Sequence, residues 1–158
     1  MSVDLSIYKS ALPYRGFTEE DWTVLSNALT EVSVKAGSVI FKENAPGDGF
    51  YWVRSGKVRI SRQVVPEGKT KAQEQLLTVL TAGNIFGEMA LIDKAARSAD
   101  ATADGDTVIH HISQTEYEKI KKDYPATALR IQDVLARILC ARMREANRSF
   151  EVIYFLFS

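Results

Sequence analysis

The hydrophobic pattern of the chain is helical near its beginning. The segment FTEEDWTVLSNAL places apolar residues at helical spacing, namely Trp22, Leu25 and Leu29. Thr18 precedes Asp21 by three positions, which is close to a capping box at a helix start. We therefore expect an N-terminal helix over residues 16–31.

From Val32 the apolar period changes to two, which is typical of strands with one buried face. Turn signals follow at regular intervals, in the segments KAGS, NAPGDG, RSGK, PEGK, TAGN and ADGD. Between them lie strand-like segments rich in Val, Ile and aromatic residues: SVIFKE, FYWVRS, KVRISRQVV, EQLLTVLT and TVIHHISQ. Short strands at this spacing predict a mainly β protein with an antiparallel β roll over residues 32–113, flanked by helices.

Helical spacing returns over residues 114–150. QTEYEKIKKDY predicts a short helix that stops at Pro125, and the same proline suits the first turn of a long helix that follows. The long helix carries an apolar stripe of Ile131, Val134, Leu135, Ile138 and Leu139. This stripe either packs on the roll or forms a helix-to-helix seam, and one helix can do both. We expect a homodimer through this helix.

The last segment, EVIYFLFS over residues 151–158, forms an apolar tail. Such a segment favours a partner, because exposing it to water promotes association. The roll of the same subunit, a second subunit and a further domain all remain open as partners. One hypothesis makes the tail an output element that moves with the long helix.

Composition narrows the function classes. A chain of 158 residues suits a single domain over residues 1–158. Lys plus Arg and Asp plus Glu number 20 each, so no overall field draws the chain to nucleic acid or to an acidic membrane, and we expect neither partner. Cys140 is the only cysteine and cannot form an internal disulfide; with no signal peptide at the N-terminus, this favours a cytoplasmic location.

The histidines argue against a metal-dependent jelly-roll enzyme. Such an enzyme needs several His and carboxylate side chains inside one barrel. The chain has only His110 and His111, which are adjacent in a predicted strand and therefore point to opposite faces. We expect no metal site, no cofactor and no catalytic residues.

The segment GNIFGEMALIDKAARSADATA, residues 83–103, concentrates the candidate chemistry. Gly87 permits a close backbone approach, and the apolar run after it can form one helical turn whose free N–H groups face an anion. Arg97 supplies a planar donor fork for phosphate oxygens, and Ser98 adds a hydroxyl group. Glu88 can accept a hydrogen bond from a sugar hydroxyl. A structural ion pair between Glu88 and Arg97 is the alternative.

This stretch resembles the phosphate-binding cassette of the cyclic nucleotide-binding domain family. The matching residues are Phe86, Gly87, Glu88, Met89, Ala90, Leu91, Arg97, Ser98 and Ala99. The resemblance extends over most of the chain and implies an eight-stranded jelly roll that binds cAMP or cGMP. It also implies that Glu88 contacts the ribose 2'-hydroxyl and that Arg97 and Ser98 hold the cyclic phosphate.

The chain departs from the family pattern at three places. Ala96 stands where a proline often precedes the arginine, and Asp100 puts a carboxylate near the phosphate unless it points away or is paired. In the bacterial catabolite-activator branch a Thr-Ser pair on the long helix reads the purine. Counting without gaps from Arg97, that pair falls on Arg142 and Met143, so the base preference stays open.

The resemblance implies a regulatory module that signals through its C-terminal helix to a partner that the sequence does not identify. In the catabolite-activator branch a helix-turn-helix domain follows this helix, whereas the present sequence ends at Ser158. Three interpretations remain: a free-standing sensor, a degenerate fold that serves as a protein interaction module, or the regulatory half of a transcription factor.

Overall fold

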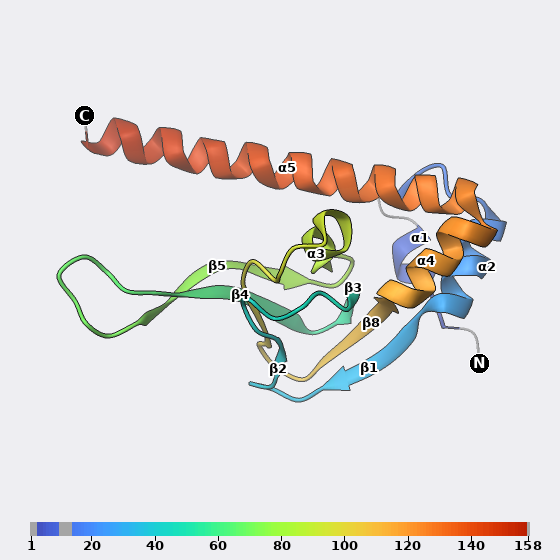
Figure 1. Ribbon diagram of the computed structural model, residues 1–158, viewed down its shortest axis with the longest axis horizontal. Coiled ribbons are helices and arrows are strands. Elements are labelled where there is room, and N and C mark those ends of the chain that lie inside the picture. The colour runs from blue at the N-terminus through green and yellow to red at the C-terminus, as the bar shows by residue number, and fades with distance from the viewer. Residues whose placement is uncertain (1–2, 10–13, 158) are drawn as a thin grey trace.

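Two antiparallel sheets and a set of helices make up the protein, for which a computed structural model describes residues 3–9 and 14–157, with side chains as far as Ser149 (Figure 1). One sheet has the strand order β1-β8-β3-β6 and the other has the order β2-β7-β4-β5. The strands are β1 Thr30–Val34, β2 Val39–Phe41, β3 Gly49–Ser55, β4 Lys57–Val64, β5 Gln73–Thr81, β6 Ile85–Phe86, β7 Asp100–Ala103 and β8 Thr107–Ser113. The helices are α1 Ser6–Lys9, α2 Glu19–Ala28, α3 Glu88–Asp93, α4 Gln114–Asp123 and α5 Pro125–Phe157. The predicted antiparallel roll with flanking helices is confirmed.

Alternation along the central strands creates two apolar cores. In β3, Phe50 and Trp52 belong to a cluster shared with the helices, whereas Tyr51 and Val53 belong to a cluster between the two sheets. Because successive strand residues point to opposite faces, one strand contributes to both clusters. The roll therefore has a filled interior and an outer face covered by helices.

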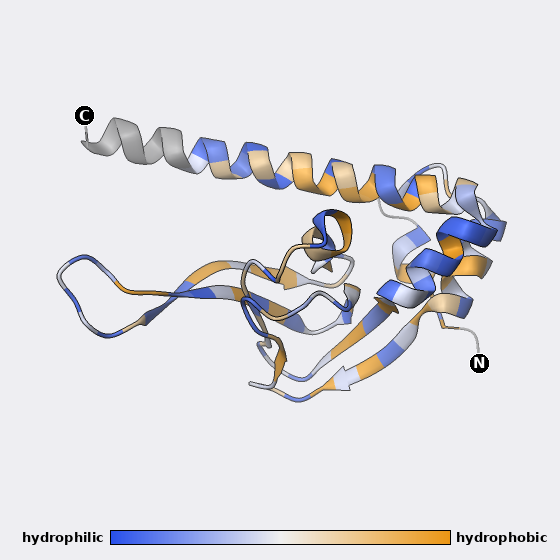
Figure 2. Cartoon of the chain, viewed as in Figure 1, coloured by the Kyte–Doolittle hydropathy of each residue, from blue (hydrophilic) through white to orange (hydrophobic). Residues whose placement is uncertain are grey.

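The hairpin of β4 and β5 extends away from the rest of the roll (Figure 1). Its two strands pair from Lys57 with Thr81 to Val64 with Gln73. In Figure 2 the loop at its tip is mainly hydrophilic. Leu80, near the base of the hairpin, is buried, whereas Leu76 and Leu77 are exposed. The projecting part of the hairpin thus contributes little to either core.

Helix α2 starts with the expected capping box but is shorter than predicted. The Thr18 hydroxyl oxygen accepts from the backbone N–H of Asp21, and an Asp21 oxygen accepts from the backbone N–H of Thr18 at 2.6 Å. The prediction of a helix over residues 16–31 is wrong at both ends. Thr18 is the N-cap, and the extended backbone of Leu29 ends the helix so that β1 can begin at Thr30.

Asp21 also ties α2 to α5. Its buried carboxylate accepts hydrogen bonds from the Thr127 hydroxyl at 2.7 Å and from Arg130 Nη1 at 2.9 Å. Burial alone would raise the pKa of Asp21, but the hydrogen bonds from Thr127 and Thr18 and the charge of Arg130 hold this pKa below its ordinary value. The carboxylate therefore stays ionised and fixes the start of α5 against α2.

The short helix α1 was not predicted from the sequence. Its Tyr8 is buried against Trp52, and the Tyr8 hydroxyl forms a hydrogen bond with His110 Nδ1 at 3.0 Å. Four residues are too few to display a helical period. This element is therefore held by contacts to the roll that no local pattern reveals.

Helix α5 packs one side on the body of the protein and then extends past it (Figure 1). Ile131, Val134 and Leu135 are buried in the cluster shared with α2 and β3, and Ile138 is partly buried against it. Most of the predicted stripe is thus covered within the same subunit. The backbone of the predicted tail continues the helix to Phe157, while Ser158 and the tail side chains lie outside the described residues.

In the part of the chain that the structure describes, no helix has both the length and the hydropathy that crossing a membrane requires.

Candidate functional site

The candidate site forms where β6 leads into α3. Gly87 joins the two elements with a backbone φ of +75°, a conformation that residues with a side chain rarely adopt. A Cβ atom added at Gly87 would lie 2.6 Å from Arg97 Nη1. Only glycine therefore allows both the sharp turn into α3 and the close approach of the Arg97 guanidinium.

The Arg97 side chain is almost entirely buried, with the residue 2% exposed. Its Nη1 donates to the carbonyl oxygen of Gly87 at 2.6 Å, and its Nη2 donates to Asp48 Oδ1 at 2.5 Å and to the Gly49 carbonyl at 3.0 Å. The guanidinium also lies 4.2 Å from the centre of the Phe41 ring. Its Nε is buried without a hydrogen-bond partner among the described residues. The site thus holds a fixed guanidinium group that is paired with Asp48 and has one N–H group to spare.

Glu88, the first residue of α3, is 1% exposed and meets α5. Its Oε1 accepts a hydrogen bond from Arg142 Nη1 at 2.5 Å. Arg142 Nη2 also donates to the carbonyl oxygen of Ile85. A buried carboxylate needs such a partner, because an unpaired charge would be costly in this position. The long helix is therefore joined to the cassette through Glu88.

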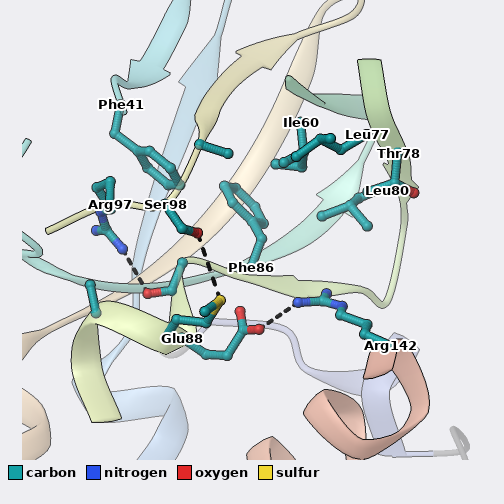
Figure 3. A pocket seen from close by; sticks show the side chains of 14 residues that line it. Phe41, Ile60, Leu77, Thr78, Leu80, Phe86, Glu88, Arg97, Ser98 and Arg142 are labelled. Carbon is teal, nitrogen blue, oxygen red and sulfur yellow. Dashed lines mark hydrogen bonds and ion pairs between the residues drawn. The ribbon is translucent and has the colours of Figure 1, made fainter. Parts of the chain in front are cut away.

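Arg97 and Glu88 both line one pocket of about 220 Å³ (Figure 3). In Figure 3 Arg97 and Arg142 approach this pocket from opposite sides, and the Glu88 carboxylate points toward Arg142. The lining comprises Phe41, Ile60, Leu77, Thr78, Leu80, Phe86, Gly87, Glu88, Met89, Ala90, Arg97, Ser98, Ala99 and Arg142. An apolar wall with a cation at one end and a carboxylate near the other suits a ligand with a flat apolar part and an anionic part.

Comparison with known proteins identifies this arrangement. The model of the family described as "Cyclic nucleotide-binding domain" matches residues 31–124, more than half of the 158 residues. The chain belongs to the cyclic nucleotide-binding domain family. The matched span includes the whole cassette and both sheets of the roll except for Thr30, the first residue of β1.

Individual relatives agree with this assignment. The cyclic AMP receptor protein of Thermus thermophilus is 34% identical over 119 residues, which cover 75% of this chain and 51% of that protein. The CRP-like cAMP-activated global transcriptional regulator of Mycobacterium tuberculosis is 28% identical over 142 residues, covering 90% of this chain and 59% of the regulator. The chain therefore spans only about half to three fifths of these relatives.

A solved structure shows the same fold. The crystal structure of a cyclic nucleotide-binding domain from Methylobacillus flagellatus superposes with a TM-score of 0.79 at 24% identity, covering 90% of this chain and 77% of that one. At this identity the likeness concerns the fold.

Nine of the ten site residues expected from the sequence line the pocket. Phe86 is buried and stacks on Tyr51, with ring centres 5.1 Å apart, while Ser98 is exposed and its Oγ lies 3.7 Å from the sulfur of Met89. Met143 is the exception, because it is 65% exposed and is not among the residues that line the pocket. Neighbouring residues on a helix point about 100° apart, so α5 directs Arg142 to the pocket and Met143 away from it.

Sequence reasoning missed the apolar wall and the partner of Arg97. Phe41, Ile60, Leu77, Thr78 and Leu80 come from three strands of the second sheet. The alternation within EQLLTVLT predicts that Thr78 and Leu80 share one face of a strand. It does not predict that this face lies beside Arg97. Asp48 lies 49 positions before Arg97 and in a loop, and no local pattern relates the two.

Asp100 does not line the pocket beside Arg97. Its Oδ2 lies 3.0 Å from Lys42 Nζ, and its Oδ1 accepts the backbone N–H of Glu43 at 2.7 Å. Burial raises the pKa of Asp100, but these two hydrogen bonds outweigh it and leave the pKa below its ordinary value. Asp100 is not among the lining residues. The Asp100 carboxylate is therefore paired with Lys42 and does not face the pocket, so its charge is not placed beside Arg97.

The two histidines lie on opposite faces of β8. His110 Nε2 lies 3.1 Å from Glu31 Oε2 on the helix-covered side, whereas His111 stacks on Tyr51 on the interior side. Within the described residues, no group of three or more His, Cys, Asp or Glu side chains is arranged to hold a metal ion.

Proposed function

We propose that this chain is a cyclic nucleotide sensor module that binds cAMP or cGMP in the cassette pocket. The observation that carries the proposal is the burial of Glu88 and Arg97 in a single apolar-walled pocket. Arg97 would hold the singly charged cyclic phosphate with help from Ser98, and Glu88 would accept the ribose 2'-hydroxyl. The purine would lie along the wall formed by Leu77, Leu80 and their neighbours.

We further propose that the signal leaves through α5. Glu88 pairs with Arg142, which belongs to α5, so a ribose hydroxyl that reaches Glu88 must share or replace the Arg142 contact. A ligand shifts a conformational equilibrium by the difference in its interactions with the two states. Competition for Glu88 supplies such a difference and connects pocket occupancy to the position of the helix.

The proposed homodimer uses a face of α5 that differs from the predicted stripe. Leu129, Ala136, Cys140 and Met143 are exposed, and at about 100° per residue they fall on one side of the helix. Their spacing is close to the heptad spacing of a helix pair. Ile131, Val134 and Leu135 occupy the opposite side of the helix in the core.

A second candidate function is a protein interaction module with an unused pocket. It is favoured by the internal pairing of both charged groups, Arg97 with Asp48 and Glu88 with Arg142. A sensor module or an interaction module could act alone or as the regulatory part of a larger transcription regulator. The larger regulator is consistent with the two bacterial relatives, because this chain spans only about half to three fifths of their length.

Calorimetric titration with cAMP and with cGMP separates the candidates. The sensor function predicts micromolar or tighter binding, about 8 kcal/mol, of at least one nucleotide. Arg97→Ala should remove about 2 to 5 kcal/mol of that binding free energy, because the phosphate would lose its buried countercharge. Arg62→Ala is the matched control, since Arg62 is half-exposed on β4 and pairs with Glu43 outside the pocket. No heat and no thermal shift at millimolar nucleotide would support the unused pocket instead.

A further inference from the structure

Asp48 is the centre of a small polar group behind the anion site. Its Oδ1 accepts from Arg97 Nη2 at 2.5 Å, and both its oxygens lie within hydrogen-bonding distance of the Tyr51 hydroxyl, at 2.9 and 3.1 Å. His111 Nε2 lies 4.0 Å from the same Oδ1. One carboxylate oxygen is therefore shared between the cation that faces the pocket and a group that can become a cation.

His111 is held in a fixed position next to Asp48. Its ring stacks on Tyr51 with centres 4.4 Å apart and planes inclined by 17°. It also packs directly on Gly49, where an added Cβ would lie 2.7 Å from His111 Nε2. This Nε2 is buried and has no hydrogen-bond partner among the described residues. A buried unpaired nitrogen calls for an explanation, because most buried polar atoms are paired.

We propose that His111 is a positioning residue that makes phosphate affinity depend on protonation. The inference rests on the proposed nucleotide-binding function. When the imidazole is neutral, Asp48 remains committed to Arg97 and neutralises it. When the imidazole gains a proton at Nε2, Asp48 has a second cation as partner, and the site as a whole carries one more positive charge. Arg97 can then direct more of its donor capacity to the phosphate.

The groups that face His111 make this assignment specific. Asp48 approaches from the loop before β3, Tyr51 from β3 and Arg97 from the segment before β7. On β1 the residue opposite His111 in the strand register is Thr30, which carries no charge. His110 points to the other face of the sheet, toward Tyr8 and Glu31. Asp48 is therefore the one carboxylate that acts on His111 among the described residues facing it.

The sign of the effect follows from these neighbours. Burial lowers the pKa of His111, the charge of Asp48 raises it and the charge of Arg97 lowers it, and the net result is a pKa below the ordinary value. His111 is thus neutral at neutral pH and gains its proton on acidification. A bound phosphate adds a negative charge near Arg97 and favours the protonated imidazole. Nucleotide affinity should therefore rise as the pH falls.

The experiment measures cAMP and cGMP affinity by calorimetry at about pH 7.5 and about pH 5, because the lowered pKa of His111 moves its titration to the acidic side of the ordinary histidine range. We expect the wild-type chain to bind roughly five-fold or more tightly at the lower pH, a typical size for coupling between two sites. In His111→Gln the side chain cannot gain a charge, so the pH dependence should disappear while affinity at the higher pH stays close to wild type. Thermal unfolding at both pH values verifies that each protein is folded.

A second measurement does not depend on a variant. The chain has only two histidines, so their imidazole proton resonances can be followed in an NMR titration, with His110 as an internal reference. Saturating nucleotide should raise the pKa of His111 and leave that of His110 unchanged. Binding with equal affinity at both pH values and an unmoved His111 titration would overturn the role of His111 alone. Absence of binding at both pH values would overturn the proposed function and this inference with it.

Discussion

At Gly87 a missing side chain does two things at once. The positive φ lets β6 turn directly into α3, and the open space admits the Arg97 guanidinium to the carbonyl oxygen of Gly87. Gly68 separates these two roles, because its φ of +74° is nearly the same but nothing lies within 4 Å of an added Cβ. The pair allows backbone strain to be distinguished from loss of the anion site.

We predict that Gly68→Ala costs roughly 1 to 2 kcal/mol of unfolding free energy, the cost of left-handed backbone, and leaves nucleotide affinity unchanged. Gly87→Ala should cost at least as much and should also abolish binding, because the new methyl group displaces Arg97. Urea denaturation and calorimetry measure the two quantities. Unchanged affinity in Gly87→Ala would show that Arg97 does not need its position against this turn.

The lowered pKa of Asp21 leads to a prediction about the stability of the fold at acidic pH. Its folded-state pKa is lowered, so its stabilising contribution is fully present above the unfolded-state pKa of about 3.9 and is lost as the pH falls through the folded value. Asp21→Asn should remove about 1 to 3 kcal/mol at neutral pH and flatten the acid limb of the stability profile. Asp133→Asn is the control, since Asp133 pairs with Arg137 on the exposed surface of α5. Equal effects of the two variants would contradict the linking role of Asp21.

Predictability from sequence at the residue scale depended on whether partners are close along the chain. Gly87, Glu88 and Arg97 fall within one short motif, and its resemblance to the phosphate-binding cassette of the family implied their roles. Asp48 could not be deduced, because it reaches Arg97 through the folding of two distant loops. Met143 does not line the pocket of this structure, since a count along the chain ignores the angle between neighbouring helical residues.

At the scale of elements, the long strands and helices were predictable, as were the short β2 and the turn of α3, whereas β6 and β7 were not. The strands of the β4–β5 hairpin show a clear apolar pattern between turn signals, so they were expected. β6 has two residues, Ile85 and Phe86, and β7 consists of Asp, Ala and Thr residues, so neither displays a period. β1 was partly assigned to the preceding helix because Thr30 and Glu31 are compatible with either structure. Packing against β8 decides the outcome there.

Helix α5 yields a prediction about coupling. Nucleotide should change hydrogen exchange over residues 136–149, and Arg142→Ala should remove most of that change, because the variant no longer connects the helix to Glu88. In the absence of nucleotide, Arg142→Ala should already exchange faster than wild type over this range. Arg144→Ala serves as the control, since Arg144 is an exposed arginine two positions away on the same helix. Exchange that nucleotide leaves unaltered in the wild type would mean that α5 is a static element.

At the scale of the whole molecule, the structure bears on which face of α5 two copies of the chain would share. The sequence placed the dimer seam on the stripe around Leu135, but this residue is fully buried within its own subunit. We propose the exposed face around Cys140 and Met143 for the contact with a second copy instead. The periodicity of α5 indicated an apolar side without showing which partner it would meet, because that depends on how α2 and β3 are placed.

The only cysteine offers a direct test of the dimer. In a parallel pair of α5 helices the two copies of Cys140 would lie close enough for a disulfide, which requires Cα atoms within about 7 Å. Mild oxidation should therefore give a covalent dimer on a non-reducing gel, and Met143→Glu should reduce its yield. Cys140→Ser controls for cross-linking elsewhere, and sedimentation reports the reversible dimer. A monomer in sedimentation with no cross-linked product would exclude this interface.

In the proposed sensor, the pairing of Glu88 with Arg142 would also set the nucleotide concentration range of the response. If the pocket can accept ribose only while that pair is open, the apparent dissociation constant equals the intrinsic one divided by the open fraction. Each additional 1.4 kcal/mol in the closed pair would then raise the half-saturating concentration about ten-fold. A single side chain on α5 thus provides an adjustable threshold: substitutions at Arg142 could retune the sensor to a different cellular nucleotide level without altering any residue of the cassette.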